Sequence, residues 1–483
     1  MNPKRPRDAP YWIPFFGHSL QFFLNSDKTI ESALNAFDRT REPFSIRVFR
    51  ERIYVISSPW DTTTAYKNST SFSWDEYLNL LLRAFGITGE ALERSWHDPR
   101  PNDREYGRNP LNPQNKNLVH LIEDFYKLQL LPGEHLARLT DAYLDCLDRV
   151  IQWSGIPSQC VLNEGFAYKR VSLKLFVRTT MTEAITRAML GDVIFDIEPE
   201  VVHQLMVLND YSWAIIFNYP KFLTPKLKPA VERLSRATRT YLRSPDSEKA
   251  DACWAIRSVL KSQEISGLDE DSRVAMVIMI WWAAHSNTVN AGFWLLSYLL
   301  FNPALLAAVK EETGHAFTNG RLDTAKLAND CPILDSVWLE VLRLVNGAMS
   351  VRKVVTPTTI SGKELESGNT VIIPFRQLHF NEHVWGQARF GFDPERFLKG
   401  QKLRNHASYR PFGGGVSLCP GRHLAKSEVC GFLATLLQRY DVALPAALPP
   451  QVFPRLDETK PSTGITGALG DMDVVFDIVS AIR

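Results

Sequence analysis

The stretch Pro411-Phe412-Gly413-Gly414-Gly415-Val416-Ser417-Leu418-Cys419-Pro420-Gly421-Arg422 decides the fold predicted for this chain. It places one cysteine, Cys419, in a glycine-rich loop directly before an apolar-periodic segment that continues through Leu424, Val429 and Phe432. Backbone N–H groups in such a loop, and the positive end of the helix expected to follow, stabilise a deprotonated sulfur. The stretch therefore predicts a cysteine thiolate that serves as a ligand.

The neighbours of the cysteine suit a flat cofactor. Phe412 is expected to pack against it, and Gly415 and Gly421 to let it approach the backbone closely. A glycine-rich turn around a buried structural cysteine is the alternative, and by composition alone it is the more frequent one. The spacing Phe-x-x-Gly-x-x-x-Cys-x-Gly is more specific, and it resembles the haem-ligand loop of the cytochrome P450 family. The resemblance implies haem b with Cys419 as the axial thiolate on iron.

Two motifs upstream of the loop also resemble motifs of the cytochrome P450 family, and they occur in the order that the family has. Glu340 and Arg343 lie three residues apart on a predicted helix with apolar flanks, and the segment Phe392-Asp393-Pro394-Glu395-Arg396-Phe397 follows. A surface helix pair is the common alternative, and such a pair contributes little to stability. The resemblance instead implies a structural triad of Glu340, Arg343 and Arg396 that holds the scaffold of the cysteine loop.

A long uncharged run lies in the middle of the chain. Residues 274–309 contain no Asp, Glu, Lys or Arg, and the run is long enough to span a bilayer. His285, Ser286, Asn287, Thr288 and Asn290 sit together at its centre, where polar groups in a membrane are costly. A helix that is apolar all round also suits the centre of a large soluble protein. We therefore expect a buried central helix.

The central helix carries Ala284-His285-Ser286-Asn287-Thr288, where the family has a small residue, Gly, any residue, an acid and Thr. By resemblance Thr288, Asn287 and His285 are the catalytic candidates. Asn287 stands in place of the acid and cannot ionise, although it can orient water or a substrate group. For His285, a core histidine bonded to a carbonyl is the favoured alternative. The Asn-Thr pair resembles the sterol 7α-hydroxylase and prostacyclin synthase branch, which contains both monooxygenases and isomerases.

Haem propionates require cations. By family position the candidates are Arg352 and Arg422, and a surface base is the alternative for each. The Trp-x-x-x-Arg motif that the family has in an earlier helix is missing from residues 118–130, where His120 and Lys127 are the only bases. Anchoring of the haem from that helix is therefore left open.

The periodicities predict a mainly α protein with small β-sheets. Helices are expected over residues 29–40, 58–68, 118–130, 134–153, 303–317 and 332–345, with a helical block up to residue 190 and two helices within residues 197–242. Residues 44–56 predict a hairpin, residues 159–162 a strand and residues 351–373 short strands. By resemblance this is the cytochrome P450 fold, one large domain over residues 11–483 with haem between the central helix and the cysteine loop.

Composition excludes several classes of protein. The chain has 483 residues, 45% of them hydrophobic, and a net charge of +2, which gives no reason to expect nucleic acid. Its six cysteines form no C-x-x-C pair, which argues against a disulfide scaffold and a structural zinc site. A reducing compartment is the natural inference.

The first ten residues, MNPKRPRDAP, are basic and proline-bearing, with no signal peptide or apolar anchor. In eukaryotic members of the family a similar hinge follows a membrane-spanning helix. The resemblance therefore implies a protein of the endoplasmic reticulum membrane, facing the cytoplasm, whose anchor has been removed to leave a soluble chain. A naturally soluble protein is the alternative.

The resemblance implies a fungal biosynthetic monooxygenase that uses O₂ and electrons from NADPH through cytochrome P450 reductase. Seven bases and no acid between Arg396 and Ser427 suggest a docking surface for an acidic electron donor, although a solvated face is the usual meaning of such a run. An isomerase or dehydratase that needs no electrons is the second hypothesis, and a non-enzymatic haem sensor or carrier is the third.

Five stretches are expected to contact substrate, namely residues 72–85, 213–222, 283–288, 348–351 and 463–466. Their aromatic and apolar side chains suggest a lipophilic substrate such as a terpenoid, steroid or alkaloid. The alternative is that these side chains pack in the protein core, because a stripe of apolar residues belongs to the core more often than to a substrate pocket.

Overall fold

The computed structural model describes residues 3–11, 16–100, 109–446 and 449–480. The chain forms two compact units, each assembled from three separate segments. Unit 1 takes its described residues from Met1–Leu78, Pro332–Cys419 and Phe453–Met472; unit 2 takes them from Asn79–Cys331, Pro420–Val452 and Asp473–Arg483. The division into a hinge over residues 1–10 and one catalytic domain over residues 11–483 stays a prediction.

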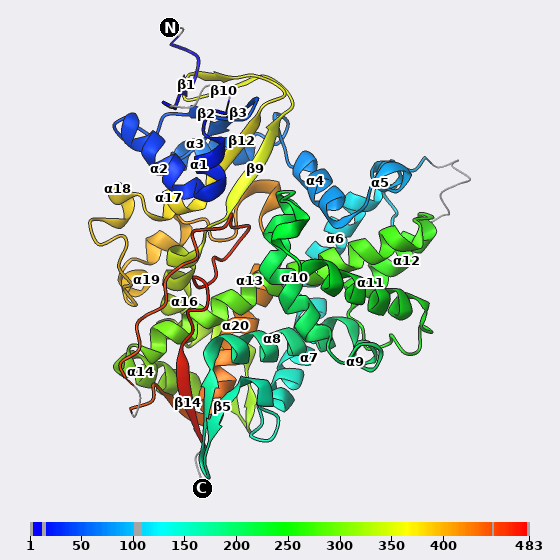
Figure 1. The fold of residues 1–483 in the computed structure, drawn as a ribbon, viewed down its shortest axis with the longest axis vertical. Coiled ribbons are helices and arrows are strands. Elements are labelled where there is room, and N and C mark those ends of the chain that lie inside the picture. Colours follow the sequence, from blue (N-terminus) through cyan, green and yellow to red (C-terminus); the bar gives the residue numbers. More distant parts are fainter. Residues whose placement is uncertain (1–2, 12–15, 101–108, 447–448, 481–483) are drawn as a thin grey trace. The chain divides into compact units, whose positions relative to one another are not determined.

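Unit 1 is built on a six-stranded sheet that includes the chain's first hairpin (Figure 1). The predicted hairpin is confirmed: Phe44 pairs with Val55 and Ile46 with Ile53, and these alternate apolar residues face a common core. The strand order is β1 (Arg7–Asp8), β2 (Phe44–Val48), β3 (Glu51–Val55), β12 (Thr370–Pro374), β9 (Met349–Val354) and β4 (Phe72–Ser73).

Short helices complete unit 1. Among them, α3 (Pro59–Lys67) begins at Ser58, whose side chain accepts a hydrogen bond from the Asp61 backbone N–H, and α16 (Pro332–Val345) lies where it was predicted. The others are α1 (Ser19–Leu24), α2 (Ser26–Ala36), α17 (Phe375–His379), α18 (Glu382–Trp385) and α19 (Arg396–Lys399), with a small hairpin of β10 (Thr358–Ile360) and β11 (Lys363–Leu365).

Unit 2 is a helical assembly around α13 (Glu270–Leu300). The Asp269 side chain accepts a hydrogen bond from the Ser272 backbone N–H at its start, and most of its residues are buried, so the predicted central helix is confirmed. α8 (Leu173–Leu190), α11 (Leu227–Arg243), α20 (Arg422–Arg439), α14 (Pro303–Gly314) and α10 (Val201–Ile216) pack against it (Figure 1).

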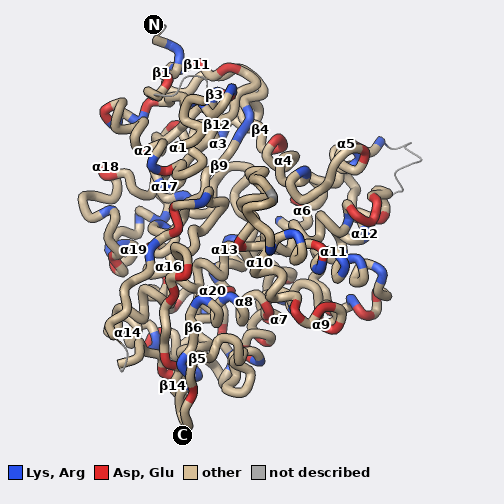
Figure 2. The backbone as a smooth tube through the Cα atoms, in the orientation of Figure 1, with Lys and Arg blue, Asp and Glu red and all other residues tan. Residues whose placement is uncertain are grey.

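Further helices surround this group: α4 (Asp75–Phe85), which starts in unit 1, then α5 (Gly89–Trp96), α6 (Leu118–Leu130), α7 (Glu134–Val150), α9 (Val193–Ile197), α12 (Trp254–Ile265) and α15 (Thr324–Asn329). Figure 2 shows mostly Lys and Arg along α11 and acidic residues at α9, and Arg233 of α11 pairs with Glu198, which directly follows α9. Within the described residues no single helix meets the requirements for crossing a membrane, although α13 and α14, bent by 115° at their break, meet them as a pair.

The four-stranded sheet of unit 2 corrects one prediction. Its order is β13 (Tyr440–Ala443), β14 (Val475–Ser480), β6 (Tyr168–Ser172) and β5 (Val161–Glu164). The helical block up to residue 190 was expected to follow the first strand directly, but β6 precedes α8. Because β6 pairs with β14, about 300 residues further along the chain, the local pattern does not reveal it. A hairpin of β7 (Phe317–Thr318) and β8 (Arg321–Leu322) completes the unit.

Candidate active site

The cysteine loop of unit 1 is a tight succession of turns. The Leu418 N–H donates to the Gly415 carbonyl at 3.2 Å, and the Cys419 N–H donates to the Phe412 carbonyl at 3.0 Å. Gly413 and Gly415 have φ angles of +78° and +63°, which favour glycine. The cysteine therefore stands at the end of a backbone-bonded turn, three residues before α20 begins.

Tyr66 of α3 explains why this loop contains glycine. A Cβ atom on Gly414 would lie 2.8 Å from the Tyr66 ring, and one on Gly415 would lie 2.7 Å from the Tyr66 carbonyl oxygen. Packing against α3 thus accounts for glycine at positions 414 and 415, and close approach of a cofactor to Gly415 stays a prediction. Gly421 caps α20 with a φ of −75°, an angle that any residue adopts, so its backbone requires no glycine.

Arg352 of β9 lies beside the cysteine loop. Its guanidinium donates to the Ser417 hydroxyl and lies 4.7 Å from the Trp74 ring centroid and 5.5 Å from that of Tyr66. It is buried, and burial lowers its pKa without removing its charge. A fixed cation thus stands next to the loop. Arg422 is the first residue of α20 and belongs to unit 2.

The Glu340, Arg343 and Arg396 side chains meet in one buried cluster. Both Arg343 Nε and Nη2 donate to the Glu340 carboxylate at 2.8 Å, and Arg396 Nε donates to Glu340 Oε1 at 3.1 Å. Glu340 and Arg343 have no exposed surface. A buried ion pair requires further hydrogen bonds, and this one has them: Arg343 also donates to the carbonyls of His379 and Arg389.

His379 connects the triad to the cysteine loop, and no sequence motif pointed to it. Its Nδ1 lies 3.1 Å from the Arg343 carbonyl, and its Nε2 accepts from the Arg410 backbone N–H at 3.0 Å. Burial lowers the pKa of His379 to about 3, so the imidazole is neutral and available as an acceptor. The Asn346 amide donates to the Pro411 carbonyl at 2.8 Å and holds the next residue of the loop.

The catalytic candidates of α13 face different ways. Asn287 is exposed, as is Ala283 one turn before it, in a helix that is otherwise largely buried. His285 is buried, and its Nδ1 lies 2.8 Å from the Trp281 carbonyl. Burial lowers the pKa of His285 to about 4, so it is neutral at pH 7, which suits the core histidine rather than a proton donor.

Thr288 is buried, and its hydroxyl interacts with two groups. It donates to the His285 carbonyl at 3.3 Å and is hydrogen-bonded to the carboxyl group of Glu428 on α20. Glu428 was missed in the sequence. The sequence offers one signal for it: Glu428 is the first acid after Glu395 and lies on a helix with an apolar period. Burying a carboxyl group on such a helix costs free energy, which suggests a specific role for it.

The expected substrate-contacting stretches form two groups, one in each unit. In unit 1, the Gly347 N–H donates to the Gly464 carbonyl at 3.0 Å, which places residues 463–466 beside residues 348–351, and β4 pairs with β9. In unit 2, the Phe85 ring lies 5.4 Å from that of Trp282, and α10 packs on α13. Each unit thus gathers its own apolar stretches.

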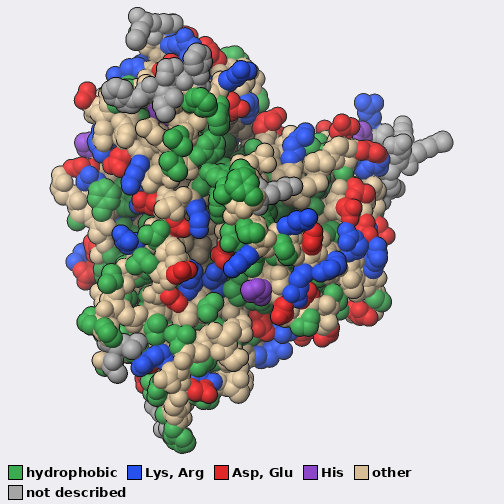
Figure 3. Space-filling model, in the orientation of Figure 1, with side chains coloured by type: hydrophobic (Ala, Val, Ile, Leu, Met, Phe, Trp, Pro, Cys, Tyr) green, Lys and Arg blue, Asp and Glu red, His purple; other side chains and the backbone are tan. Residues whose placement is uncertain are grey.

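The bases between Arg396 and Ser427 differ in their contacts. Arg396 is buried in the triad, Arg404 pairs with Asp335, and Arg410 donates to Thr63. Lys399 pairs with Glu395, while Lys402 is exposed. Figure 3 likewise shows both signs of charge dispersed over the face it presents. Three of these seven bases, Arg396, Arg404 and Arg410, therefore serve contacts within unit 1, and docking of an electron donor on the exposed bases stays a prediction.

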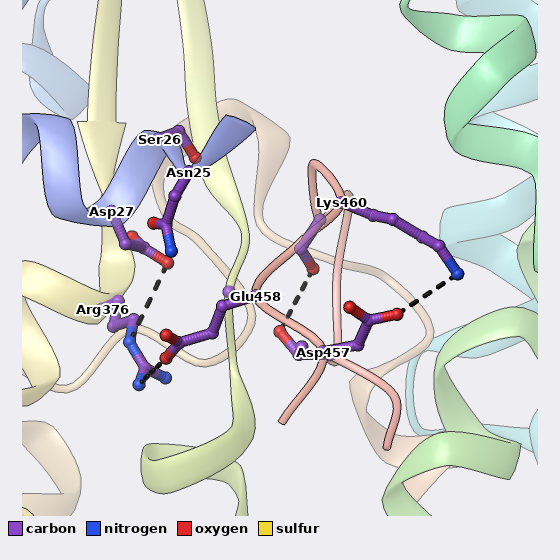
Figure 4. A pocket seen from close by; sticks show the side chains of 10 residues that line it. Asn25, Ser26, Asp27, Arg376, Asp457, Glu458 and Lys460 are labelled. Atoms are coloured by element: carbon purple, nitrogen blue, oxygen red, sulfur yellow. Dashed lines mark hydrogen bonds and ion pairs between the residues drawn. The ribbon is translucent and has the colours of Figure 1, made fainter. Parts of the chain in front are cut away.

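A small polar pocket in unit 1 lies beside residues 463–466 (Figure 4). Arg376 stands between two acids, donating to Glu458 at 2.7 Å and lying 3.8 Å from Asp27. Burial raises the pKa of Asp27 to about 6. The pocket is lined by Asn25, Ser26, Asp27, Gly347, Arg376, Asp457, Glu458, Lys460, Ser462 and Thr466. These charges tie the 453–472 segment to α2 and α17.

The residues present fit a haem group. In unit 1 a half-buried cysteine ends a backbone-bonded turn, and a buried arginine lies beside that turn. Thiolate and guanidinium are the groups that iron and propionates require.

Comparisons with known proteins agree with this fold. The cytochrome P450 family model matches residues 167–464. A cytochrome P450 monooxygenase of Gibberella zeae is 34% identical over 455 residues, covering 89% of this chain and 80% of that protein. Cytochrome P450 monooxygenase poxD of Penicillium oxalicum is 26% identical, covering 92% and 88%, and cytochrome P450 7A1 of Oryctolagus cuniculus is 23% identical, covering 96% and 92%.

Among solved structures, retinoic acid-bound cyanobacterial CYP120A1 superimposes with a TM-score of 0.70 and 19% identity, covering 99% of both chains. The fold class predicted from the sequence is thereby confirmed. The chain belongs to the cytochrome P450 family of haem-thiolate oxidoreductases, in which an axial cysteine binds the iron.

Proposed function

We propose that Cys419 is the axial ligand and that the protein is a monooxygenase of a lipophilic small molecule. The observation that carries the proposal is the turn ending at Cys419, which holds the sulfur on a backbone-bonded frame beside buried Arg352. A thiolate-ligated haem supplies O₂ activation, because the thiolate pushes electron density that favours O–O cleavage. The protein positions substrate and manages protons.

Each remaining candidate has a proposed role. Arg352 and Arg422 pair with the propionates, and Phe412 packs on the macrocycle near Cys419. The triad of Glu340, Arg343 and Arg396 keeps the loop's supporting segments in place through His379. Asn287 orients water or a substrate group at the exposed stripe of α13.

The proposed substrate is a terpenoid, steroid or alkaloid of secondary metabolism. Support comes from the aromatic and apolar stretches that each unit gathers, and from fungal relatives named as cytochrome P450 monooxygenases. Such pockets bind through apolar contact, with a few polar groups that fix orientation.

Replacing Cys419 tests the ligand assignment. We expect Cys419→Ala to lose the shifted absorbance band that reduced, CO-bound thiolate haem shows, because no sulfur remains at that position. Cys331→Ala, which removes a buried cysteine of unit 2, is the matched control and should keep the band. A Cys419→Ala protein that retains the band overturns the assignment.

An isomerase or dehydratase is the second candidate, because Asn287, exposed near the middle of α13, carries an amide in place of the family's carboxylate. Turnover with and without reductase and NADPH separates the two. The monooxygenase needs both, whereas product formed without electrons establishes the isomerase. If a small molecule changes the haem absorbance spectrum but no product forms with or without reductase and NADPH, the result supports a non-enzymatic haem sensor instead.

We also propose that the native protein works at the cytoplasmic face of the endoplasmic reticulum membrane, where its reductase resides. Support comes from apolar side chains exposed near the first residues of unit 1: Leu20 and Leu24 lie one turn apart on α1, and Phe16 and Phe49 are exposed as well. Such a surface suits contact with lipid headgroups and acyl chains. Fractionation of cells that express the native protein tests this, and recovery in the supernatant alone contradicts it.

A further inference from the structure

Residues 455–469 of unit 1 form a hairpin whose two sides are joined by backbone hydrogen bonds. Leu456 pairs with Ala468 across an antiparallel bridge, and the Asp457 N–H donates to the Gly467 carbonyl at 2.9 Å. Residues 463–466, a stretch expected to contact substrate, lie on the returning side of this 455–469 hairpin. The position of that stretch therefore depends on the contacts that hold the hairpin.

The returning side of the hairpin is bonded to the end of α16 and the residues directly after it. The Thr466 N–H donates to the Val345 carbonyl at 2.9 Å, next to the bond between Gly347 and Gly464. A Cβ atom on Gly347 would lie 2.4 Å from the Thr466 hydroxyl oxygen, so a larger residue at position 347 would push the hairpin away. These contacts form the first attachment of the hairpin.

Asn346 makes this first attachment rigid. Its backbone forms an antiparallel bridge with Ile465, and its side-chain amide donates to the Pro411 carbonyl of the cysteine loop at 2.8 Å. One residue thus contacts both the hairpin and the cysteine loop. The first attachment is therefore fixed from two sides.

Arg376 of α17 makes the second attachment, at the base of the hairpin (Figure 4). Its Nη2 atom donates to the Glu458 carboxylate at 2.7 Å, and its Nε atom lies 3.8 Å from Oδ2 of Asp27 on α2. Its Nη1 atom also donates to the Leu344 carbonyl of α16 at 3.4 Å. Because its side chain is only 17% exposed, solvent screens these charges less than at an open surface.

Asp27 depends on the charge of Arg376. Its Oδ1 atom is buried and has no hydrogen-bond partner among the described residues. Burial raises the pKa of Asp27 to about 6, an effect that Arg376 opposes and Glu458 adds to. The other base that lines this pocket, Lys460, lies 3.2 Å from Asp457 instead. Without Arg376, two uncompensated acids would therefore face each other between α2 and the hairpin.

We propose that Arg376 is a positioning residue for the proposed reaction: by binding Glu458 it fixes the 455–469 hairpin and with it the substrate-contacting residues 463–466. The inference rests on the proposed monooxygenase function and adds a residue that sets the fit of the substrate without touching it. When the guanidinium is lost, the base of the hairpin is released while Asn346 still holds the returning side. Binding of bulky ligands should then change, whereas Cys419 should still ligate the haem iron.

Hydrogen–deuterium exchange of the haem-loaded enzyme tests whether Arg376 holds the hairpin. We expect Arg376→Gln to speed exchange in peptides from residues 455–469 by about tenfold, because hydrogen bonds to charged groups contribute factors of this size. Glu458→Gln should do the same, and the double variant should add little, since the two side chains act as one pair. Arg389→Gln is the matched control, because Arg389 is similarly buried and pairs with Glu382 at 3.1 Å.

Exchange that matches wild type in both single variants overturns the inference. If Arg376→Gln does not bind haem, Glu458→Gln decides the matter, because Glu458 is the more exposed partner and its replacement is the milder change.

Two azoles separate the positioning role from a general loosening of the haem site. Imidazole only ligates the iron, whereas clotrimazole ligates it and carries three aromatic rings beyond its imidazole. In spectral titrations we expect Arg376→Gln and Glu458→Gln to weaken clotrimazole binding several-fold and to leave imidazole binding unchanged. Arg376→Lys, which keeps a cation between the two acids, should restore clotrimazole binding.

Equal weakening of both azoles, or of neither, overturns the positioning role. A wild-type protein without the CO band of thiolate-ligated haem refutes the proposed function instead. The exchange measurement then still decides whether Arg376 holds the hairpin, so the two failures can be told apart.

Discussion

The buried carboxyl group of Glu428 also links folding to pH. Its pKa is raised from 4.5 to about 8 in the folded protein, so the folded state binds the proton more tightly. The resulting stability is complete below about pH 4.5 and is lost as the pH rises through about 8, at about 1.4 kcal/mol per pH unit. We expect Glu428→Gln to remove this slope. Denaturant midpoints of both proteins between pH 5 and pH 8 provide the measurement, and parallel curves contradict the prediction.

Gly415 illustrates a single position with two constraints. An alanine there meets a positive φ and a Tyr66 carbonyl 2.7 Å from its Cβ atom. We expect Gly415→Ala to destabilise unit 1 by about 1–3 kcal/mol or more and to reduce haem content. Gly362 has a φ of +73° with open space around it, so Gly362→Ala isolates the backbone strain. Equal losses of stability in Gly415→Ala and Gly362→Ala would show that the contact with Tyr66 contributes nothing.

At the scale of elements, α16 and α19 depend on one buried cluster. Removing one charge from a buried pair costs about 3–5 kcal/mol, because the partner is left uncompensated. We expect Glu340→Gln to destabilise the protein by that amount, with loss of bound haem as the cysteine loop loosens. The exposed Glu134–Arg138 pair on α7 has the same kinds of side chain, and Glu134→Gln should change the unfolding midpoint little. A Glu340→Gln protein as stable as this control refutes the role.

The elements also show what local sequence determines. α6 and α16 lie where they were predicted, because each has a helical apolar period and α6 begins at a capping residue, Asn117. β6 and β14 were missed because their pairing is non-local. Cys419 and the triad residues were found through motif spacing. Tyr66, His379 and Glu428 belong to no motif, and only the packing of helices against the loop or against α13 reveals them.

For the whole molecule, contact with an electron donor depends on exposed bases such as Lys402. Lys402 is the exposed base of the 396–410 segment that is not committed to an internal contact. We expect Lys402→Glu to slow reduction by the reductase and to make it less sensitive to salt, because a steering charge is reversed. Lys228→Glu, on exposed α11, is the control. Reduction rates that match wild type across ionic strengths contradict this docking site.

The parallel pairing of β3 with β12 has a consequence for synthesis in the cell. Ile53 of β3 pairs with Thr370 of β12. During synthesis β3 is therefore complete long before the strand with which it pairs. At roughly 5–20 residues per second, the ribosome takes tens of seconds to deliver β12. Meanwhile the edge of β3 offers unpaired backbone groups to other nascent chains. The availability of chaperones that cover such edges should therefore limit the yield of folded protein. The supply of haem should affect the yield only after residue 419 has emerged from the ribosome.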